Sequence, residues 1–102
     1  MTDQRIYTIA DHYGLRHQCA KAREELKELV EALEVFEGKW TPDTFVHVAE
    51  EIADVEIMTK QLKHLMANAV IVRRFKNQKL ERQLNRIAQQ SINQELTSKK
   101  TN

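Results

Sequence analysis

The feature that most restricts the fold is a long apolar stripe in the first half of the chain. From Leu15 onward, apolar residues recur in steps of four, three, four, three and four positions. This spacing follows one face of an α-helix, so it predicts an amphipathic helix that ends near Gly38. The residues of this leucine stripe are Leu15, Cys19, Ala22, Leu26, Leu29 and Leu33.

Local signals predict a helix on either side of the leucine stripe. Residues 4–13 predict a short first helix, because Gly14 suits the C′ position, where a positive φ is needed. After the stripe, Thr41 is a suitable N-cap and Pro42 a suitable N1 residue for a helix over about 42–67. Apolar residues lie on most sides of this helix, which predicts that it is buried on most sides.

A last helix is expected over about 69–95, after a break near Asn68. It carries an apolar stripe and, beside it, a basic row. The stripe consists of Leu80, Leu84 and Ile87, and the basic row of Lys79, Arg82 and Arg86. Residues 97–102 are expected to form a flexible tail.

Composition limits the fold class further. The 102 residues include two glycines and one proline, which are few for a β-rich fold with many turns. We therefore expect an all-α fold, a four-helix-type bundle in a single domain over 1–96. A bundle this small, with one helix apolar on most sides, is expected to complete its core with a second copy.

The sequence also bears on the location of the protein. Cys19 is the single cysteine, so no internal disulfide can form, which fits a reducing cytosol. No apolar run approaches the ~20 residues that a membrane helix needs. The first residues lack the layout of a signal peptide. We therefore expect a cytoplasmic protein without a membrane partner.

Charge is distributed unevenly, although the formal net charge is only +1. Residues 21–56 hold eleven acidic residues and four Lys or Arg, whereas residues 57–102 hold two acidic residues and ten Lys or Arg. Two interpretations stay open. The two sections attract each other within the fold, or they form a cation site beside an anion site, as a metal-bound polyphosphate requires.

Two pairs of acids have the spacing of a shared helical face. Glu25 and Glu28 are three positions apart, and so are Glu51 and Asp54 in the next helix. Residues at this spacing lie on one side of a helix, so each pair can direct two carboxylates to one point. Like charges at i, i+4, such as Glu24 and Glu28, cost a few tenths of a kcal/mol, and the sequence accepts this cost.

The second pair is expected to face the interior of the bundle, in line with Met58 and Leu65. Two carboxylates there must be protonated, bind a cation or contact trapped water. A hard divalent ion such as Mg²⁺ takes oxygen ligands, and no histidine or cysteine at this spacing favours zinc. One E-x-x-E pair is common on solvated helices, but two pairs on neighbouring helices favour a metal site.

These residues resemble the signature of the MazG-type all-α nucleoside triphosphate pyrophosphohydrolases. That signature is E-x-x-E, a spacer and E-x-x-D. Here it reads Glu25-Leu-Lys-Glu28, a spacer of 22 residues, and Glu51-Ile-Ala-Asp54. The similarity covers roughly residues 6–88 and includes Lys21 before the paired glutamates. The single-domain form is similar to the compact bacterial and phage-type members.

The resemblance implies an enzyme that hydrolyses nucleoside triphosphates between the α and β phosphates, as a nucleotide house-cleaning activity. It implies Mg²⁺, or else Mn²⁺, and a homodimer or homotetramer. The implied metal ligands are Glu25, Glu28, Glu51 and Asp54. The implied catalytic residues are Glu24, which would orient or deprotonate the attacking water, and Glu25. The candidate phosphate-binding residues are Lys21, Lys79, Arg82 and Arg86, and for the last three a solvated or salt-bridged helix face stays open as the alternative.

Two other functions stay open. A catalytically inactive MazG-like helical bundle would act as an interaction or regulatory module, although the presence of all four motif acids argues against inactivity. A nucleic-acid binder would use residues 73–86 as a basic helix. The acidic section 21–56 and the lack of helix-turn-helix spacing argue against that function, so we expect no nucleic-acid partner.

Overall fold

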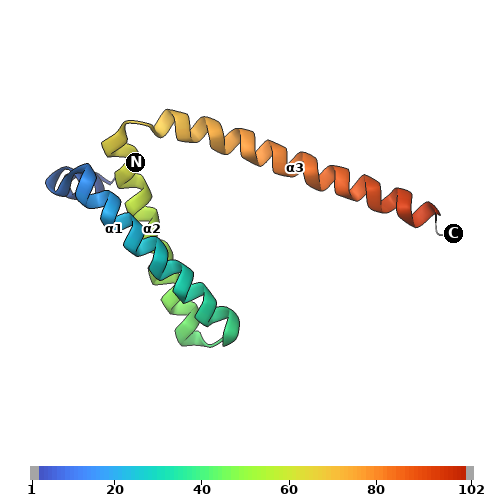
Figure 1. Cartoon of the computed structure of the whole chain (residues 1–102), viewed down its shortest axis with the longest axis horizontal. Helices are drawn as coiled ribbons and strands as arrows, with labels where there is room; N and C mark the ends of the chain where they lie inside the picture. Colours follow the sequence, from blue (N-terminus) through green and yellow to red (C-terminus); the bar gives the residue numbers. More distant parts are fainter. Residues whose placement is uncertain (1–2, 101–102) are drawn as a thin grey trace. The chain divides into compact units, whose positions relative to one another are not determined.

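The computed structural model describes residues 3–100 and is all-helical over this range. Its helices are α1 (Gln4–Gly38), α2 (Pro42–Met66) and α3 (Ala69–Lys100) (Figure 1). The all-α fold class that the sequence predicts is therefore confirmed.

Helix α1 begins at an aspartate N-cap and bends at an internal glycine. Asp3 accepts a hydrogen bond of 3.0 Å from the backbone N–H of Arg5, which satisfies one of the free donors at the helix start. Gly14 departs from helical geometry with φ 82° and ψ 170°, a conformation open almost only to glycine. The predicted helix over 4–13 therefore forms, but the chain continues through this bend into the longer helix.

Helix α2 follows the predicted bounds closely. Oγ1 of Thr41 accepts a hydrogen bond of 3.1 Å from the backbone N–H of Thr44, and the Thr41 N–H donates one of 3.0 Å to Oγ1 of Thr44. Pro42 stands in the first turn. The helix ends before Ala67, which adopts the left-handed conformation with φ 54° and ψ 38°. The predicted helix over 42–67 is confirmed to within one residue.

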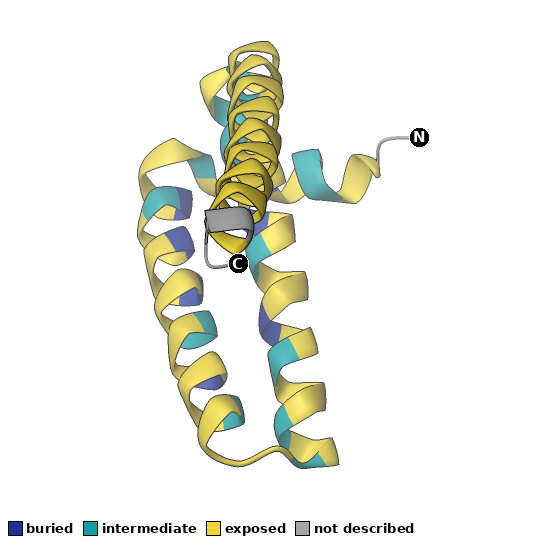
Figure 2. Ribbon diagram, turned by 90° about the vertical axis from the view of Figure 1, so that its right-hand side faces the viewer, coloured by how far each residue is buried: buried dark blue, intermediate teal, exposed yellow. Residues whose placement is uncertain are grey.

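Residues 39–41 join α1 and α2 into a hairpin of two antiparallel helices (Figure 1). The buried residues of the two helices lie on the sides that face each other (Figure 2). We call these residues the hairpin seam. Its apolar members are Ala10, Ala22, Ala32 and Met58, and its polar members are Gln18, Glu25, Glu51 and Gln61. The two helices therefore bury as many polar side chains as apolar ones between them.

The face of α1 that α2 covers overlaps the leucine stripe only in part. Of the four buried positions after the bend, Gln18, Glu25 and Ala32 stand one residue before members of the stripe, and Ala22 belongs to the stripe itself. Leu15, Leu26 and Leu33 remain 42%, 47% and 39% exposed. Alanine lets helix backbones approach more closely than leucine does, so α2 packs over the small side chains and leaves the leucines beside the contact.

Helix α2 is likewise covered on one side only. Its buried residues are Glu51, Met58 and Gln61, whereas Phe45 and Ile52 are exposed. The prediction that this helix is buried on most sides is therefore wrong for the single chain, because the hairpin supplies only one neighbouring helix to cover it.

Helix α3 extends beyond its predicted end. The sequence predicts a helix over 69–95 and a flexible tail over 97–102, but the helix continues to Lys100, and residues 101 and 102 lie outside the described range. No glycine or proline interrupts residues 69–100, so the sequence contains no strong stop signal. The chain divides into two compact units between Asn68 and Ala69, and the single domain over 1–96 stays a prediction.

Candidate metal centre

Three carboxylates from the two helices of the hairpin converge on one point. Glu25 and Glu28 come from α1 and Glu51 from α2, and each offers a carboxylate oxygen within 4.8 Å of the other two. Glu25 and Glu51 are each 7% exposed, whereas Glu28 lies nearer the surface. The i, i+3 spacing on α1 and the antiparallel pairing with α2 explain why these groups meet. We call these three residues the carboxylate cluster.

Two oxygens of the carboxylate cluster are buried without a hydrogen-bond partner, Oε2 of Glu25 and Oε2 of Glu51. His47 approaches the other oxygen of Glu51, with Nε2 3.9 Å from Oε1. An unsatisfied buried acceptor costs about 1–3 kcal/mol, and more when it is charged. A divalent cation would remove this cost, and a set of carboxylate oxygens without thiolate or imidazole ligands fits a hard ion such as Mg²⁺.

The electrostatics of the cluster disfavour three charged carboxylates. Repulsion from Glu25, followed by desolvation, raises the pKa of Glu28 above its ordinary value, and Glu51 adds to this. Lys21 offsets part of the charge, since its Nζ lies 3.1 Å from Oε1 of Glu25 and 3.6 Å from Oε2 of Glu24. The hydrogen bond to Glu25 and then the charge of Glu24 raise the pKa of Lys21. One lysine does not balance these acids, so the site still favours a cation.

Asp54, the fourth predicted ligand, is not part of the carboxylate cluster found among the described residues. It lines an adjoining cavity of about 510 Å³ together with Glu25, Glu24 and Lys21. The aspartate side chain is one methylene shorter than glutamate, so its carboxylate reaches less far from the helix. The structure thus brings together three of the four predicted ligands, and Lys21 and Glu24 lie beside them.

Sequence reasoning missed two buried glutamines next to the cluster. Nε2 of Gln18 donates a hydrogen bond of 2.6 Å to Oε1 of Gln61, across the seam from α1 to α2. A signal was available, because Gln18 stands four residues before Ala22 and seven before Glu25, on the same face of α1. A polar residue at a buried position of a helix indicates a hydrogen bond inside the core.

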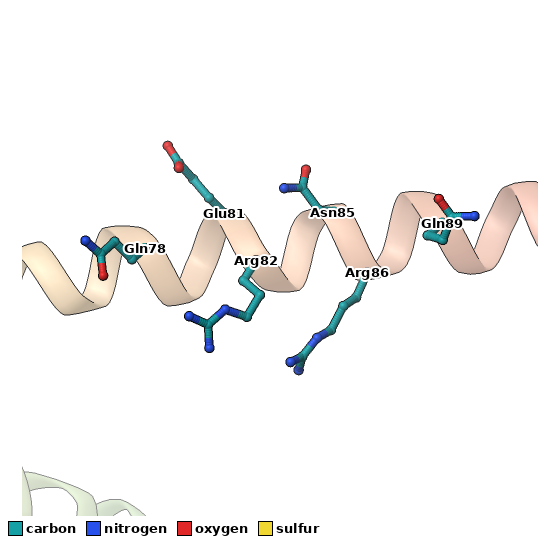
Figure 3. Close-up of a pocket in the computed structure, with 6 residues that line it drawn as sticks. All are labelled: Gln78, Glu81, Arg82, Asn85, Arg86 and Gln89. Atoms are coloured by element: carbon teal, nitrogen blue, oxygen red, sulfur yellow. The ribbon is translucent and has the colours of Figure 1, made fainter.

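The predicted basic row lies on α3, in the second unit of the chain. Arg82 and Arg86 project from one side of α3, whereas Glu81 and Asn85 project from the other (Figure 3). These side chains line a shallow hollow of about 570 Å³ that is formed by α3 alone. Contact of Arg82, Arg86 and Lys79 with a substrate stays a prediction.

Comparison of the chain with protein-family models, with curated proteins and with solved structures returned no match. Over the residues that the structure describes, no helix is both long and apolar enough to cross a membrane. The fold and the site therefore define an all-α protein with a cluster of three carboxylates in a helical hairpin.

Proposed function

We propose that the protein hydrolyses nucleoside triphosphates, as NTPs or dNTPs, to the monophosphate and pyrophosphate in a Mg²⁺-dependent reaction. The observation that carries this proposal is the carboxylate cluster, in which two buried oxygens have no hydrogen-bond partner. Such groups reduce stability unless they bind something. The resemblance of residues 25–54 to the MazG-type signature supports the same reaction.

The residues proposed to hold the ion are Glu25, Glu28 and Glu51, with Asp54 as the fourth ligand. Bound Mg²⁺, or alternatively Mn²⁺, would neutralise charge on the triphosphate and lower the pKa of a coordinated water. The all-carboxylate donor set supports a hard ion over zinc.

The chain's own residues would supply proton transfer and phosphate binding. Glu24 is exposed and lines the cavity beside Glu25, so its carboxylate is available to orient the attacking water and accept its proton. Lys21 stays charged, because the acids around it raise its pKa, and it can pair with a phosphate oxygen. Water adds to the α phosphorus, the bond from this phosphorus to the α–β bridging oxygen breaks, and pyrophosphate leaves.

The basic row on α3 is the second proposed phosphate-binding element. Lys79, Arg82 and Arg86 are exposed, and two of these side chains share one side of the helix (Figure 3). Guanidinium groups bind phosphate oxygens in a bidentate manner, which suits the outer phosphates of the substrate. Activity that is unchanged in a combined Arg82→Ala and Arg86→Ala variant would contradict this role.

Incubation with a panel of NTPs and dNTPs, with and without Mg²⁺, followed by a pyrophosphate assay, tests the reaction. We expect release of pyrophosphate that requires Mg²⁺. The rate of release should fall by about 10–100-fold or more in Glu28→Ala and in Asp54→Ala. Glu31→Ala, which removes an exposed acid from the same helix, serves as the matched control and should retain activity. Absence of pyrophosphate with every nucleotide would contradict the proposal.

We further propose that a second copy of the chain covers the exposed apolar surface of the hairpin, as a homodimer or homotetramer. Large apolar side chains remain exposed on both helices and on their connection, among them Leu26, Trp40 and Phe45. Burial of apolar area stabilises by about 25 cal/mol per Å². Two hairpins of two helices each would form the predicted four-helix-type bundle. Sedimentation velocity tests this, and a monomer at all concentrations would contradict it.

The exposed apolar surface also supports a second candidate function, an inactive helical bundle that acts as an interaction or regulatory module. The two candidates differ in a simple way, since a protein that associates but releases no pyrophosphate would be the module. The enzyme is favoured because association alone leaves the buried oxygens of Glu25 and Glu51 unexplained. A nucleotide substrate also suits the cytoplasmic location expected for the protein.

A further inference from the structure

The cavity beside the carboxylate cluster has two chemically different ends. Its charged end contains Lys21, Glu24, Glu25 and Asp54. Its other end is apolar and aromatic, with Ile9 and Tyr13 from the start of α1, His17 after the bend, and Ile57 and Met58 from α2. The volume of about 510 Å³ lies in the range of small-molecule sites. The cavity therefore suits a ligand with a charged part and a flat apolar part.

A stacked pair of rings lines the apolar end. Tyr13 and His17 stand four positions apart, on either side of the bend at Gly14, and their ring centroids are 4.5 Å apart with an interplanar angle of 15°. Tyr13 is 51% exposed. A nucleobase is a flat π system, and every base can stack on an aromatic side chain whatever groups its edge carries.

A chain of hydrogen bonds through the core reaches His17, one member of the ring pair. The Gln61 Nε2 donates to the backbone oxygen of Ile6 at 3.3 Å, and the Gln18 Nε2 donates to Oε1 of Gln61 at 2.6 Å. Oε1 of Gln18, which lies 2.7 Å from Nδ1 of His17, is therefore left as the acceptor, and Nδ1 is the donor. Neutral His17 then carries a lone pair on Nε2, which can accept a hydrogen bond from a ligand.

We infer that this cavity receives the nucleoside part of a nucleoside triphosphate, with the base stacked on Tyr13 and the phosphates toward the carboxylate cluster. The inference rests on the proposed function, because it assigns a substrate part to the same site. Ile9, Ile57 and Met58 supply apolar contacts to the sugar and base, and His17 accepts a hydrogen bond from them. Selectivity for nucleotides over plain polyphosphate follows from this end of the cavity.

The structure provides a matched control for the stacking residue. Tyr7 also belongs to the first part of α1 and also stacks on a histidine, with its ring centroid 4.4 Å from that of His64 and an interplanar angle of 22°. Tyr7 does not line the cavity. Replacement of Tyr13 or of Tyr7 by leucine therefore removes the same chemical group from the same kind of ring pair, and only one of the two changes the site.

Calorimetric titration in excess Mg²⁺ tests the inference, with α,β-methylene-dATP, α,β-methylene-dCTP and inorganic tripolyphosphate as probes. In Tyr13→Leu we expect both nucleotide analogues to bind about 5- to 100-fold more weakly, while tripolyphosphate changes less than about twofold. Tyr13→Phe, which keeps a ring, and Tyr7→Leu should bind all three probes as the wild type does. If Tyr13→Leu does not fold, judged by circular dichroism, His17→Leu makes the same comparison.

Three results would overturn the inference. One is equal weakening of the analogues and tripolyphosphate, one is nucleotide binding that does not depend on Tyr13, and one is no analogue binding to the wild type. Sedimentation velocity of Tyr13→Leu identifies a surface used for association, since dissociation of the oligomer with unchanged nucleotide affinity would assign the ring pair to a second copy instead.

Failure of this inference is distinguishable from failure of the proposed reaction, because the analogues bind without being hydrolysed. A protein that binds them through Tyr13 but releases no pyrophosphate from any triphosphate refutes the reaction and keeps the nucleoside site. A protein that hydrolyses triphosphates with an affinity independent of Tyr13 keeps the reaction and refutes the nucleoside site.

Discussion

Replacement of Glu51 by glutamine is expected to stabilise the protein when no divalent cation is present. The Glu51 side chain is buried, its Oε2 has no donor, and a carboxylate oxygen lies within 4.8 Å of oxygens of Glu25 and Glu28. The amide keeps the shape of the side chain, removes one negative charge and supplies an N–H donor to its neighbours. Relief of an unsatisfied buried acceptor is worth about 1–3 kcal/mol, so the free energy of unfolding should rise by that amount.

Thermal unfolding followed by circular dichroism, in EDTA and in excess Mg²⁺, measures this effect. A gain of 1 kcal/mol shifts the Tm by about 4–8 °C for a domain of 60–100 residues, so the change in EDTA is readily detected. Wild-type protein should gain about 2.7 kcal/mol in Mg²⁺ at a hundredfold excess over the Kd. Glu51→Gln lacks one ligand and should lose most of that gain. The stability advantage of Glu51→Gln over the wild type in EDTA should therefore become smaller, or change sign, in Mg²⁺.

Glu31→Gln is the matched control, because Glu31 is an exposed acid of the same helix as Glu25 and Glu28. Its stability should stay within about 0.5 kcal/mol of the wild type in both conditions. Two results would refute the reasoning: a Glu51→Gln protein less stable than the wild type in EDTA, or an equal Mg²⁺-dependent gain in both proteins. Either would mean that the buried carboxylates serve the fold and not a cation.

Three further predictions concern the bend, the glutamine pair and pH. Gly14→Ala should destabilise the protein by about 1–3 kcal/mol, because alanine is strained at φ 82°. Gly38→Ala lies at a helical position with open space around it and should stabilise the protein by about 0.4–1 kcal/mol. The Tm values of the two variants should therefore shift in opposite directions. Gln61→Ala leaves a buried amide donor unpaired and should cost about 1–3 kcal/mol in denaturant unfolding, while Gln89→Ala, on the exposed face of α3, should stay within about 0.5 kcal/mol. Because the pKa of Glu28 is raised, repulsion between the Glu28 carboxylate and its acidic neighbours destabilises the protein above that pKa, and this repulsion is relieved as the pH falls toward the ordinary glutamate value of about 4.3. In EDTA, the free energy of unfolding of the wild type should therefore rise relative to that of Glu28→Gln over this pH range. The affinity for Mg²⁺ should fall over the same range.

The bend in α1 and the bounds of α2 are predictable because they are set by local chemistry. The positive φ that Gly14 tolerates, the Thr41 hydroxyl that caps α2 and the left-handed Ala67 each act within a few residues of the chain. The end of α3 is different, since residues 96–100 contain no glycine or asparagine to form a C-cap and no proline to stop the helix. Helical propensity continues there, and the helix continues with it.

The faces of the helices are less predictable than their bounds. Periodicity marks the residues that gain from burial, but it does not show which neighbour covers them. Within the single chain, α2 covers Ala22 and Ala32 of α1 and leaves Leu26 and Leu33 outside. The same limit applies to the site, where i, i+3 spacing predicts that Glu25 and Glu28 share a face but not that Asp54 stays outside the cluster.

The composition of the hairpin seam connects stability with function in this chain. Among the described residues, three of its four apolar members are alanines, and one methyl group contributes little to burial. The leucines that would contribute more lie outside the seam, while two carboxylate oxygens inside it lack partners. The free energy of unfolding of a native protein is only about 5–15 kcal/mol, so weak apolar burial and unpaired buried carboxylate oxygens together would use up much of it. A second chain that covers the leucines would stabilise the folded protein by mass action, and so would a cation that binds the carboxylates. Folding, association and ligand binding are therefore expected to depend on one another.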